Sequence, residues 1–296
     1  MLILRGSIVL LITLALIAAI SSMIAIGMGF LDRSEGEIEK KHAFIQTIAF
    51  TQDTVSILNK KAKEINSSDA LDLLVMTPIE LKTDEMELAI TFDSAAKGIN
   101  PNNLIKIVNK KKRINADYVL LFDRILQNAN VQNKELFLAM LEDSLDDDLN
   151  ERLPGSEIAL YDRRFAQGRI ESLQKFMMIV DHYVKTTEDS AIYAIPWKRI
   201  LSFYAKDIDF NYIDPYLLRQ MLPFLDEEQM RKFHAGGFEK FEDLHLPRED
   251  IDELKRYNVT FFVPVIEVNM TAKGQGRSSF IYNIEKRKVL DIGYRI

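Results

Sequence analysis

The feature that most constrains this chain is a run of 25 residues without a charge, at positions 7–31, rich in Leu, Ile and Ala. As an α-helix rising about 1.5 Å per residue, this run exceeds the roughly 30 Å core of a bilayer. It is also longer than the apolar core of a secretory signal, so it predicts a membrane anchor. Arg5 precedes the run and Asp32 follows it, which places the N-terminus in the cytoplasm and the body outside. The alternative is a cleaved signal peptide, with Ala19 and Ser21 near the cut.

A second helical pattern follows the uncharged run. From residue 37 to residue 65, apolar side chains recur at helical spacing, and no proline or glycine interrupts them after Gly36. Such spacing predicts an amphipathic helix. We therefore expect an apolar rod that continues into an amphipathic stem. The alternative is a separate amphipathic helix after a short break at Gly36.

The rest of the chain divides into a strand, a long helical block and a final group of strands. Residues 86–92 alternate and predict a strand, which the turn-forming residues 97–104 end. Apolar residues then recur at three- and four-residue spacing in the segments 115–127, 133–145, 169–186, 196–204, 214–223, 226–234 and 247–256. Strand-like segments follow at 259–270, 279–284 and 289–296. One strand before the helical block and three after it predict an α+β fold, in which a helical insert interrupts a single antiparallel sheet.

Composition removes several classes of function. The chain has no cysteine, which excludes disulfides, thiolate metal sites and cysteine nucleophiles. Its net charge of -6 lacks the basic footprint of a nucleic-acid-binding protein, so nucleic acid is not an expected partner. His42, His182, His234 and His245 follow no metal-binding or catalytic spacing, and the basic run 110–113 predicts an exposed loop. We expect no active site, and hence a protein that is not an enzyme.

The first eleven residues resemble the start of type IV pilin-like precursors, in which a short basic leader ends in glycine and an apolar helix follows at once. On that resemblance, a prepilin peptidase cuts between Gly6 and Ser7. Most pilins carry Glu at the fifth mature position, where it pairs with the N-terminal amine of the subunit above; here that position holds Leu11. A carboxylate in lipid is costly unless it is paired in this way. A subunit without it suits the tip of a filament, and the K-type minor pseudopilins of type II secretion, the GspK family, lack this Glu.

Local strings extend the resemblance to the GspK family along nearly the whole chain. Residues 98–104 look like its Asn-rich strand end, and residues 143–148 look like its Asp-Trp-Ile-Asp-x-Asp string, with Ser144 in place of Trp. Residues 208–211 look like a degraded Ile-Asn-Val-Asn string. The family combines a pilin α/β body, whose long N-terminal helix packs on an antiparallel sheet, with a large inserted all-α domain. The resemblance therefore implies a leader peptide at 1–6, a transmembrane and stem helix at 7–65, the first part of the pilin body at 66–104, an inserted helical domain at 105–257 and sheet-completing strands at 258–296.

An acidic cluster provides the one candidate metal site. Asp143, Asp146, Asp148 and Glu157 lie within fifteen residues of one another, and hard oxygen ligands of this kind suit calcium. K-type pseudopilins bind calcium, so the resemblance implies a calcium site among these residues. The spacing is not that of an EF-hand loop. The alternative is a solvated acidic loop after a helix.

The resemblance also implies a function and a location. The chain would be a minor pseudopilin that initiates and caps the periplasmic pseudopilus of a type II secretion system. It would cross the bacterial inner membrane once, with its N-terminus in the cytoplasm and its body in the periplasm. Its partners would be other minor pseudopilins in a tip complex, the major pseudopilin, prepilin peptidase and inner-membrane lipid. The alternatives are a tip subunit of a type IV pilus or DNA-uptake apparatus, and a signal-anchored periplasmic scaffold protein.

Overall fold

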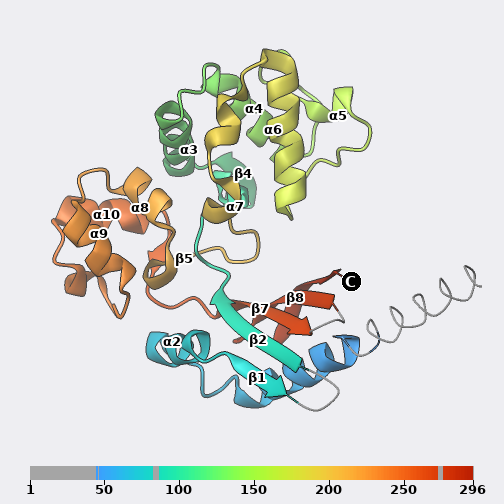
Figure 1. Ribbon diagram of the computed structural model, residues 1–296. Helices are drawn as coiled ribbons and strands as arrows, with labels where there is room; N and C mark the ends of the chain where they lie inside the picture. The colour runs from blue at the N-terminus through green and yellow to red at the C-terminus, as the bar shows by residue number, and fades with distance from the viewer. Residues whose placement is uncertain (1–44, 46, 83–86, 273–275, 296) are drawn as a thin grey trace, which may run out of the picture.

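The computed structural model describes residues 45, 47–82, 87–272 and 276–295, and Figure 1 shows it as a ribbon. A five-stranded sheet with the order β1-β2-β7-β8-β9 forms the base of the molecule, and all its neighbouring strands are antiparallel. The strands are β1 (Ile79–Lys82), β2 (Glu87–Ser94), β7 (Val265–Ala272), β8 (Gly276–Asn283) and β9 (Lys288–Arg295). Because β2 pairs with β7, the chain leaves the sheet after its second strand and returns beside it, with residues 95–264 in between.

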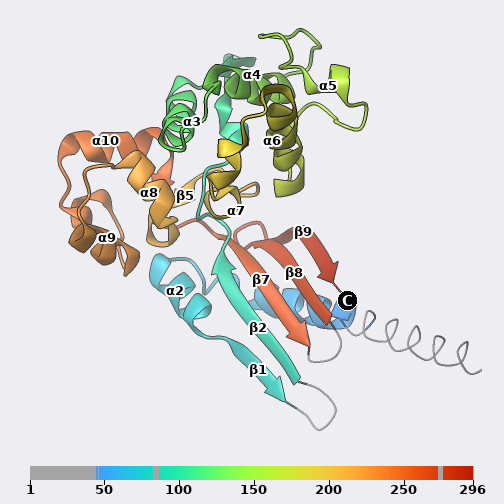
Figure 2. The same cartoon turned by 45° about the horizontal axis from the view of Figure 1, so that its top comes forward.

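The stem helix, described at residues 47–61, covers one face of this sheet (Figure 2). Leu58 packs with Val268 and Phe280 in one buried cluster. Apolar side chains alternate along β7 and β8, so the pleat brings them to the same face of the sheet. The Tyr282 hydroxyl donates a hydrogen bond of 2.7 Å to Asn59 Oδ1 and fastens the helix to β8.

The direction of the stem helix gives the body two distinct ends. Thr54, midway along the helix, contacts Met270 near the end of β7. Beyond the helix, Ser68 accepts a hydrogen bond of 2.9 Å from Asn211, close to the residues that enter β7 at Val265. The helix therefore runs toward the end of the sheet to which the insert is attached. The insert lies at the opposite end of the body from the start of the stem helix (Figure 1).

A short helix, α2 (Ser68–Met76), leads from the stem helix to the sheet. Ser67 caps its N-terminus through a side-chain hydrogen bond, and Leu71 is fully buried in the cluster below the sheet. On its other face Leu73 and Met76 are 70% and 77% exposed. This helix thus leaves two large apolar side chains in contact with solvent.

Residues 95–264 form a mainly helical insert, coloured from green to orange in Figure 1. Its α-helices are α3 (Ala116–Asn128), α4 (Lys134–Leu145), α5 (Ile158–Tyr161), α6 (Leu173–Thr187), α7 (Trp197–Ile200), α8 (Pro215–Met221), α9 (Glu227–His234) and α10 (Arg248–Arg256). Its 3-10 helices are η1 (Pro101–Leu104), η2 (Ser190–Ala194), η3 (Phe210–Tyr212) and η4 (Phe241–Leu244). An antiparallel hairpin, β3 (Ile105–Val108) with β4 (Lys111–Ile114), and a parallel pair, β5 (Ile208–Asp209) with β6 (Val259–Thr260), complete it.

The insert has a continuous apolar core of its own. Trp197, the only tryptophan of the chain, is 2% exposed, and its ring centroid lies 4.9 Å from that of Phe176 and 6.0 Å from that of Phe137. Its indole Nε1 donates a hydrogen bond of 3.0 Å to the carbonyl of Ile192, so the ring is buried without an unpaired donor. The stem helix and the sheet share a second cluster. The described residues therefore form two main cores, and a small third cluster lies where the insert joins the sheet: Ala96, Ala205, Val263 and Val265.

The predicted α+β fold, an antiparallel sheet with a stem helix and a helical insert, is confirmed. Two segments differ from expectation because they pair with segments that are distant in the sequence. The helix predicted at 196–204 is only four residues long (α7), because Leu201 bridges to Ile99 and the Ser202 amide donates to the Ile99 carbonyl at 2.9 Å. The strand predicted at 259–270 is divided into β6 and β7, with Pro264, which has no N–H, just before β7.

One further difference is local. The basic run 110–113 was expected in a loop, but residues 111–113 belong to β4. Asn109 and Lys110 both have positive φ and form the two-residue turn of the β3–β4 hairpin, a role that Asn favours. The side chains of the run are exposed, as expected.

Several predictions concern residues outside the described ranges. These are the membrane-spanning segment 7–31, the cleavage site between Gly6 and Ser7, and Leu11. They stay predictions. Within the part of the chain that the structure describes, no helix combines the length and apolar character required for a membrane span.

Candidate functional site

The acidic loop, residues 146–157, folds back over the end of α4 and surrounds one arginine. The Arg152 guanidinium forms ion pairs through Nη1 with Asp143 and Asp146, and through Nε with Glu142 at 3.1 Å. Asp143 is fully buried in the last turn of α4, so its charge requires a partner inside the protein. Arg152 therefore supplies a positive charge at the centre of this cluster.

Asp143 is held by further donors. The Ser156 hydroxyl and the backbone N–H of Arg152, the latter at 3.1 Å, both donate to its Oδ2. Asp146 is less well satisfied, because its Oδ1 is buried and has no hydrogen-bond partner among the described residues. That buried oxygen is thus free to bind an additional cation.

Glu157 and Asp148 approach the same loop from the other side. Glu157, at the start of α5, is fully buried, and this burial is the main reason why the pKa of its carboxyl is raised. Gln167 Nε2 donates to Glu157 Oε2 at 2.8 Å and also to the backbone carbonyl of Asp148. The Asp148 carboxylate is exposed and accepts from the Asn150 amide at 2.9 Å. Asp148 thus reaches Glu157 through its backbone and not through its side chain.

The four predicted calcium ligands belong to the same loop and its flanks, and each has at least one partner within the protein. Across the described residues, no three or more acidic, histidine or cysteine side chains are grouped so as to hold a metal ion. The roles of Arg152 and Gln167 were not predicted from the sequence. The one indication was an arginine within an acidic run, which is a candidate partner for the carboxylates. Calcium binding at this loop stays a prediction, and as arranged Arg152 offsets part of the negative charge of Glu142, Asp143 and Asp146.

The histidines that the structure describes add no metal ligand to the carboxylates of this loop. The ring of His182 lies 3.1 Å from the Gly155 carbonyl and beside Tyr161, and His245 Nδ1 lies 2.7 Å from the Asp243 carbonyl. These are contacts to neighbouring backbone. His42 lies outside the described residues.

The junction between the insert and the sheet is the other place where buried polar groups gather. Asp209 accepts hydrogen bonds from the amides of Asn211 at 3.1 Å and Val263 at 3.0 Å. Burial raises its pKa from the ordinary value of 3.8 to about 6, and the nearby Asp72 adds to the rise. Asp209 thus ties the chain that leaves the insert to the chain that enters the sheet.

Asn211 makes the second set of contacts at this junction. Its Nδ2 donates to Ser68 Oγ at 2.9 Å, to the Phe238 carbonyl at 2.9 Å and to the Phe261 carbonyl at 3.1 Å. Its Oδ1 accepts from the Phe238 amide at 2.9 Å. One side chain therefore joins α2, the insert and the segment that leads into β7.

Close backbone packing fixes the insert at the same place. The Ala95 amide donates to the Val265 carbonyl at 3.0 Å, so the outgoing and returning chains lie side by side. At Gly98 an added Cβ would lie 2.3 Å from the Ile200 carbonyl oxygen. Any side chain would clash there, so the position requires glycine. On the far side of the sheet, the Tyr204 hydroxyl donates to Asp291 of β9. The insert is thus attached to the sheet at several points and not by a loose linker.

Comparison with known proteins gives one informative result. No protein-family model matches the chain. No curated protein matches it. Among solved structures, the chain is similar to a chain in the crystal structure of the GspK–GspI–GspJ complex from the enterotoxigenic Escherichia coli type 2 secretion system, with a TM-score of 0.64 and 12% identity. The match covers 89% of this chain and 99% of that chain.

These observations define the structural class of the protein. The chain is an α+β protein in which a stem helix packs on an antiparallel sheet and a helical insert rises from one end of that sheet. At 12% identity the likeness establishes this shared fold over nearly the full length of the neighbour. The resemblance to the K-type minor pseudopilins of type II secretion is therefore confirmed at the level of the fold.

Proposed function

We propose that this chain is a minor pseudopilin that initiates and caps the periplasmic pseudopilus of a type II secretion system. One observation carries the proposal: the insert stands at the end of the body that is distal to the start of the stem helix. A subunit anchored by its N-terminal helix would present the insert at the top of a filament, where its bulk blocks a further subunit. Leu11 supports this role, because it offers no carboxylate to a subunit stacked above.

In this role the chain catalyses no reaction. It acts by assembly, with its N-terminal helix in the inner membrane and its body in the periplasm, and the partners are two other minor pseudopilins and then the major pseudopilin. The solved complex that shares this fold contains GspK, GspI and GspJ. Prepilin peptidase would first remove residues 1–6, and calcium would act, where it binds, by stiffening the acidic loop.

Co-expression tests the assembly directly. The full chain, produced with the two other minor pseudopilins of the same secretion system, is expected to elute with them as one complex in size-exclusion chromatography. Three separate peaks would contradict the proposed function. Repeating the run with calcium and with a chelator shows whether the ion contributes to assembly.

The mature N-terminus tests the processing step. Mass spectrometry of the protein from its own cells is expected to find a chain that begins at Ser7. An intact Met1, or a start near residue 22, would instead support a signal-anchored scaffold or a cleaved signal peptide. Deletion of the gene is expected to stop protein secretion, whereas a loss of DNA uptake would indicate the pilus-type alternative.

Removal of the insert tests the capping step. Ser94 and Ile266 are paired in the sheet, so an Asn-Gly turn can replace residues 95–265 and close β2 and β7 into a hairpin. The shortened chain keeps the cluster of the stem helix and sheet, and circular dichroism checks that it folds. We expect it to fail to restore secretion in the deletion strain. Full restoration would show that the insert is not the cap.

A further inference from the structure

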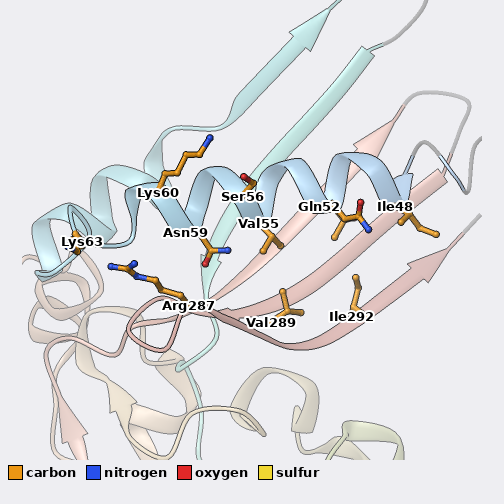
Figure 3. A pocket seen from close by; sticks show the side chains of 11 residues that line it. Ile48, Gln52, Val55, Ser56, Asn59, Lys60, Lys63, Arg287, Val289 and Ile292 are labelled. Atoms are coloured by element: carbon orange, nitrogen blue, oxygen red, sulfur yellow. The ribbon is translucent and has the colours of Figure 1, made fainter.

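A groove runs between the stem helix and the edge strand β9, on the same face of the sheet as the helix. Its volume is about 860 Å³, and it extends from Ile48 on the helix to Lys63 in the turn that follows the helix. Figure 3 shows Gln52 and Val55 directed from the helix toward β9, where Val289 faces them. The groove thus has one helical wall and one strand wall.

A β-bulge shapes the strand wall. Tyr282 pairs with Val289 while Phe280 pairs with Ile292, so one extra residue, Leu290, interrupts the alternation on β9. The bulge places both Val289 and Ile292 on the face that the stem helix covers. Ile292 is nevertheless 41% exposed. An apolar floor is left open at the edge of the sheet.

The charges around this groove have one sign. Lys60, Lys63 and Arg287 line it, and no aspartate or glutamate does. None of the three forms an ion pair with any residue that the structure describes. In a chain with a net charge of -6, a groove lined only by neutral and basic side chains is a local exception. Such a rim attracts a partner that carries carboxylates.

The length of the groove favours a helical partner. From Ile48 to Asn59 its wall follows about three helical turns, or roughly 17 Å at 1.5 Å per residue. A helix with apolar residues on one face fits a groove with an apolar floor, and carboxylates beside that face would meet the basic rim. We propose that this groove binds the amphipathic stem helix of a second, different pseudopilin subunit, through apolar residues over Val289 and Ile292 and carboxylates near Lys60 and Lys63. The inference rests on the proposed function, since it names the surface through which that assembly forms.

Charge reversal provides the first test. The double variant Lys60→Glu with Lys63→Glu changes two exposed side chains that make no ion pair, and the matched control Lys110→Glu with Lys111→Glu makes the same change in charge on the β3–β4 hairpin. Both variants are produced as the full chain with the two other minor pseudopilins of the system. We expect the groove variant to bind them about tenfold more weakly, because each exposed ion pair contributes up to a few-fold and reversal turns attraction into repulsion. The control is expected to bind like the wild type.

The result separates this inference from the proposed function. If the unchanged chain forms no complex with those subunits, the proposed function fails. If the unchanged chain assembles and the groove variant assembles equally well, only the groove inference is overturned. An equal loss in both variants would also overturn it, because the effect would then reflect total charge.

Cross-linking identifies the occupant. Because the chain has no cysteine, Ser56→Cys introduces a unique thiol at the groove, and Ser190→Cys introduces one on the insert as a control. A maleimide-linked photoreactive benzophenone is attached to each thiol in the assembled complex. We expect only the groove position to cross-link to the stem helix of another pseudopilin. Cross-links mainly to a second copy of this chain, or none above the control, would overturn the inference.

Discussion

Replacement of Asn211 by alanine is expected to weaken the junction between the two cores. The Asn211 amide is 8% exposed and bonds to Ser68, Phe238 and Phe261, which belong to three different segments. Alanine would leave the Phe238 amide and carbonyl without their partner in a place that water reaches poorly. An unpaired buried polar group costs about 1–3 kcal/mol. With two such groups and the lost bond to Phe261, we expect the free energy of unfolding to fall by about 3 kcal/mol.

Two companion variants sharpen this prediction. Asn211→Asp is expected to be at least as harmful, because a carboxylate oxygen would face two carbonyls and lie close to Asp209. Asn66→Ala is the control, since Asn66 is exposed and makes no hydrogen bond with any described residue. A surface change of this kind alters stability by about 0.5 kcal/mol or less.

Urea unfolding of residues 45–296, followed by the fluorescence of the single tryptophan Trp197, measures all three variants. The expected order of midpoints is wild type and Asn66→Ala together, then Asn211→Ala, then Asn211→Asp. Equal midpoints for Asn211→Ala and Asn66→Ala would refute the reasoning. They would show that apolar packing alone holds the insert to the sheet.

Three further predictions concern single positions. Gly98→Ala is expected to lower the free energy of unfolding by about 3 kcal/mol, because its Cβ would lie 2.3 Å from the Ile200 carbonyl oxygen. Gly293→Ala is the control: its Cβ would make only ordinary contacts, so its thermal unfolding should be nearly unchanged. Asp209 has a higher pKa in the folded chain than in the unfolded chain, so its ionisation lowers the free energy of unfolding as pH rises from about 4 to about 6. Asp209→Asn is expected to remove up to about 3 kcal/mol of this pH-dependent loss, measured by urea unfolding at each pH. Arg152→Gln is expected to destabilise the chain by about 3 kcal/mol in chelator, since it leaves a buried carboxylate uncompensated. Millimolar calcium should restore part of that loss in differential scanning fluorimetry, and a variant indifferent to both changes would contradict the role given to Arg152.

The sequence predicted the parts of the fold that depend on periodic apolar patterns. The segments 115–127, 133–145 and 226–234 became α3, α4 and α9 within a residue or two, because apolar residues recur in each at three- and four-residue spacing. The late strands were also found. Short elements such as β1 and the β3–β4 hairpin were missed, since four residues carry too little pattern to separate a strand from a loop.

The candidate sites could be predicted only in part. The acidic residues Asp143 and Glu157 are visible in the sequence, but their partners Arg152 and Gln167 depend on how the loop folds back over α4. The junction was harder still to foresee. Asn211 lay in a string that resembles a family motif, yet its contacts to residues 143 and 50 positions away depend on the tertiary fold.

The pairing of Ala95 with Val265 has a consequence for how such a chain can change over time. Both connections between the sheet and the insert leave neighbouring strands, so their ends are about 5 Å apart. Any unit with adjacent termini can be grafted at this point without altering a single strand register. The insert can therefore be enlarged, trimmed or exchanged while the stem helix and the sheet stay the same.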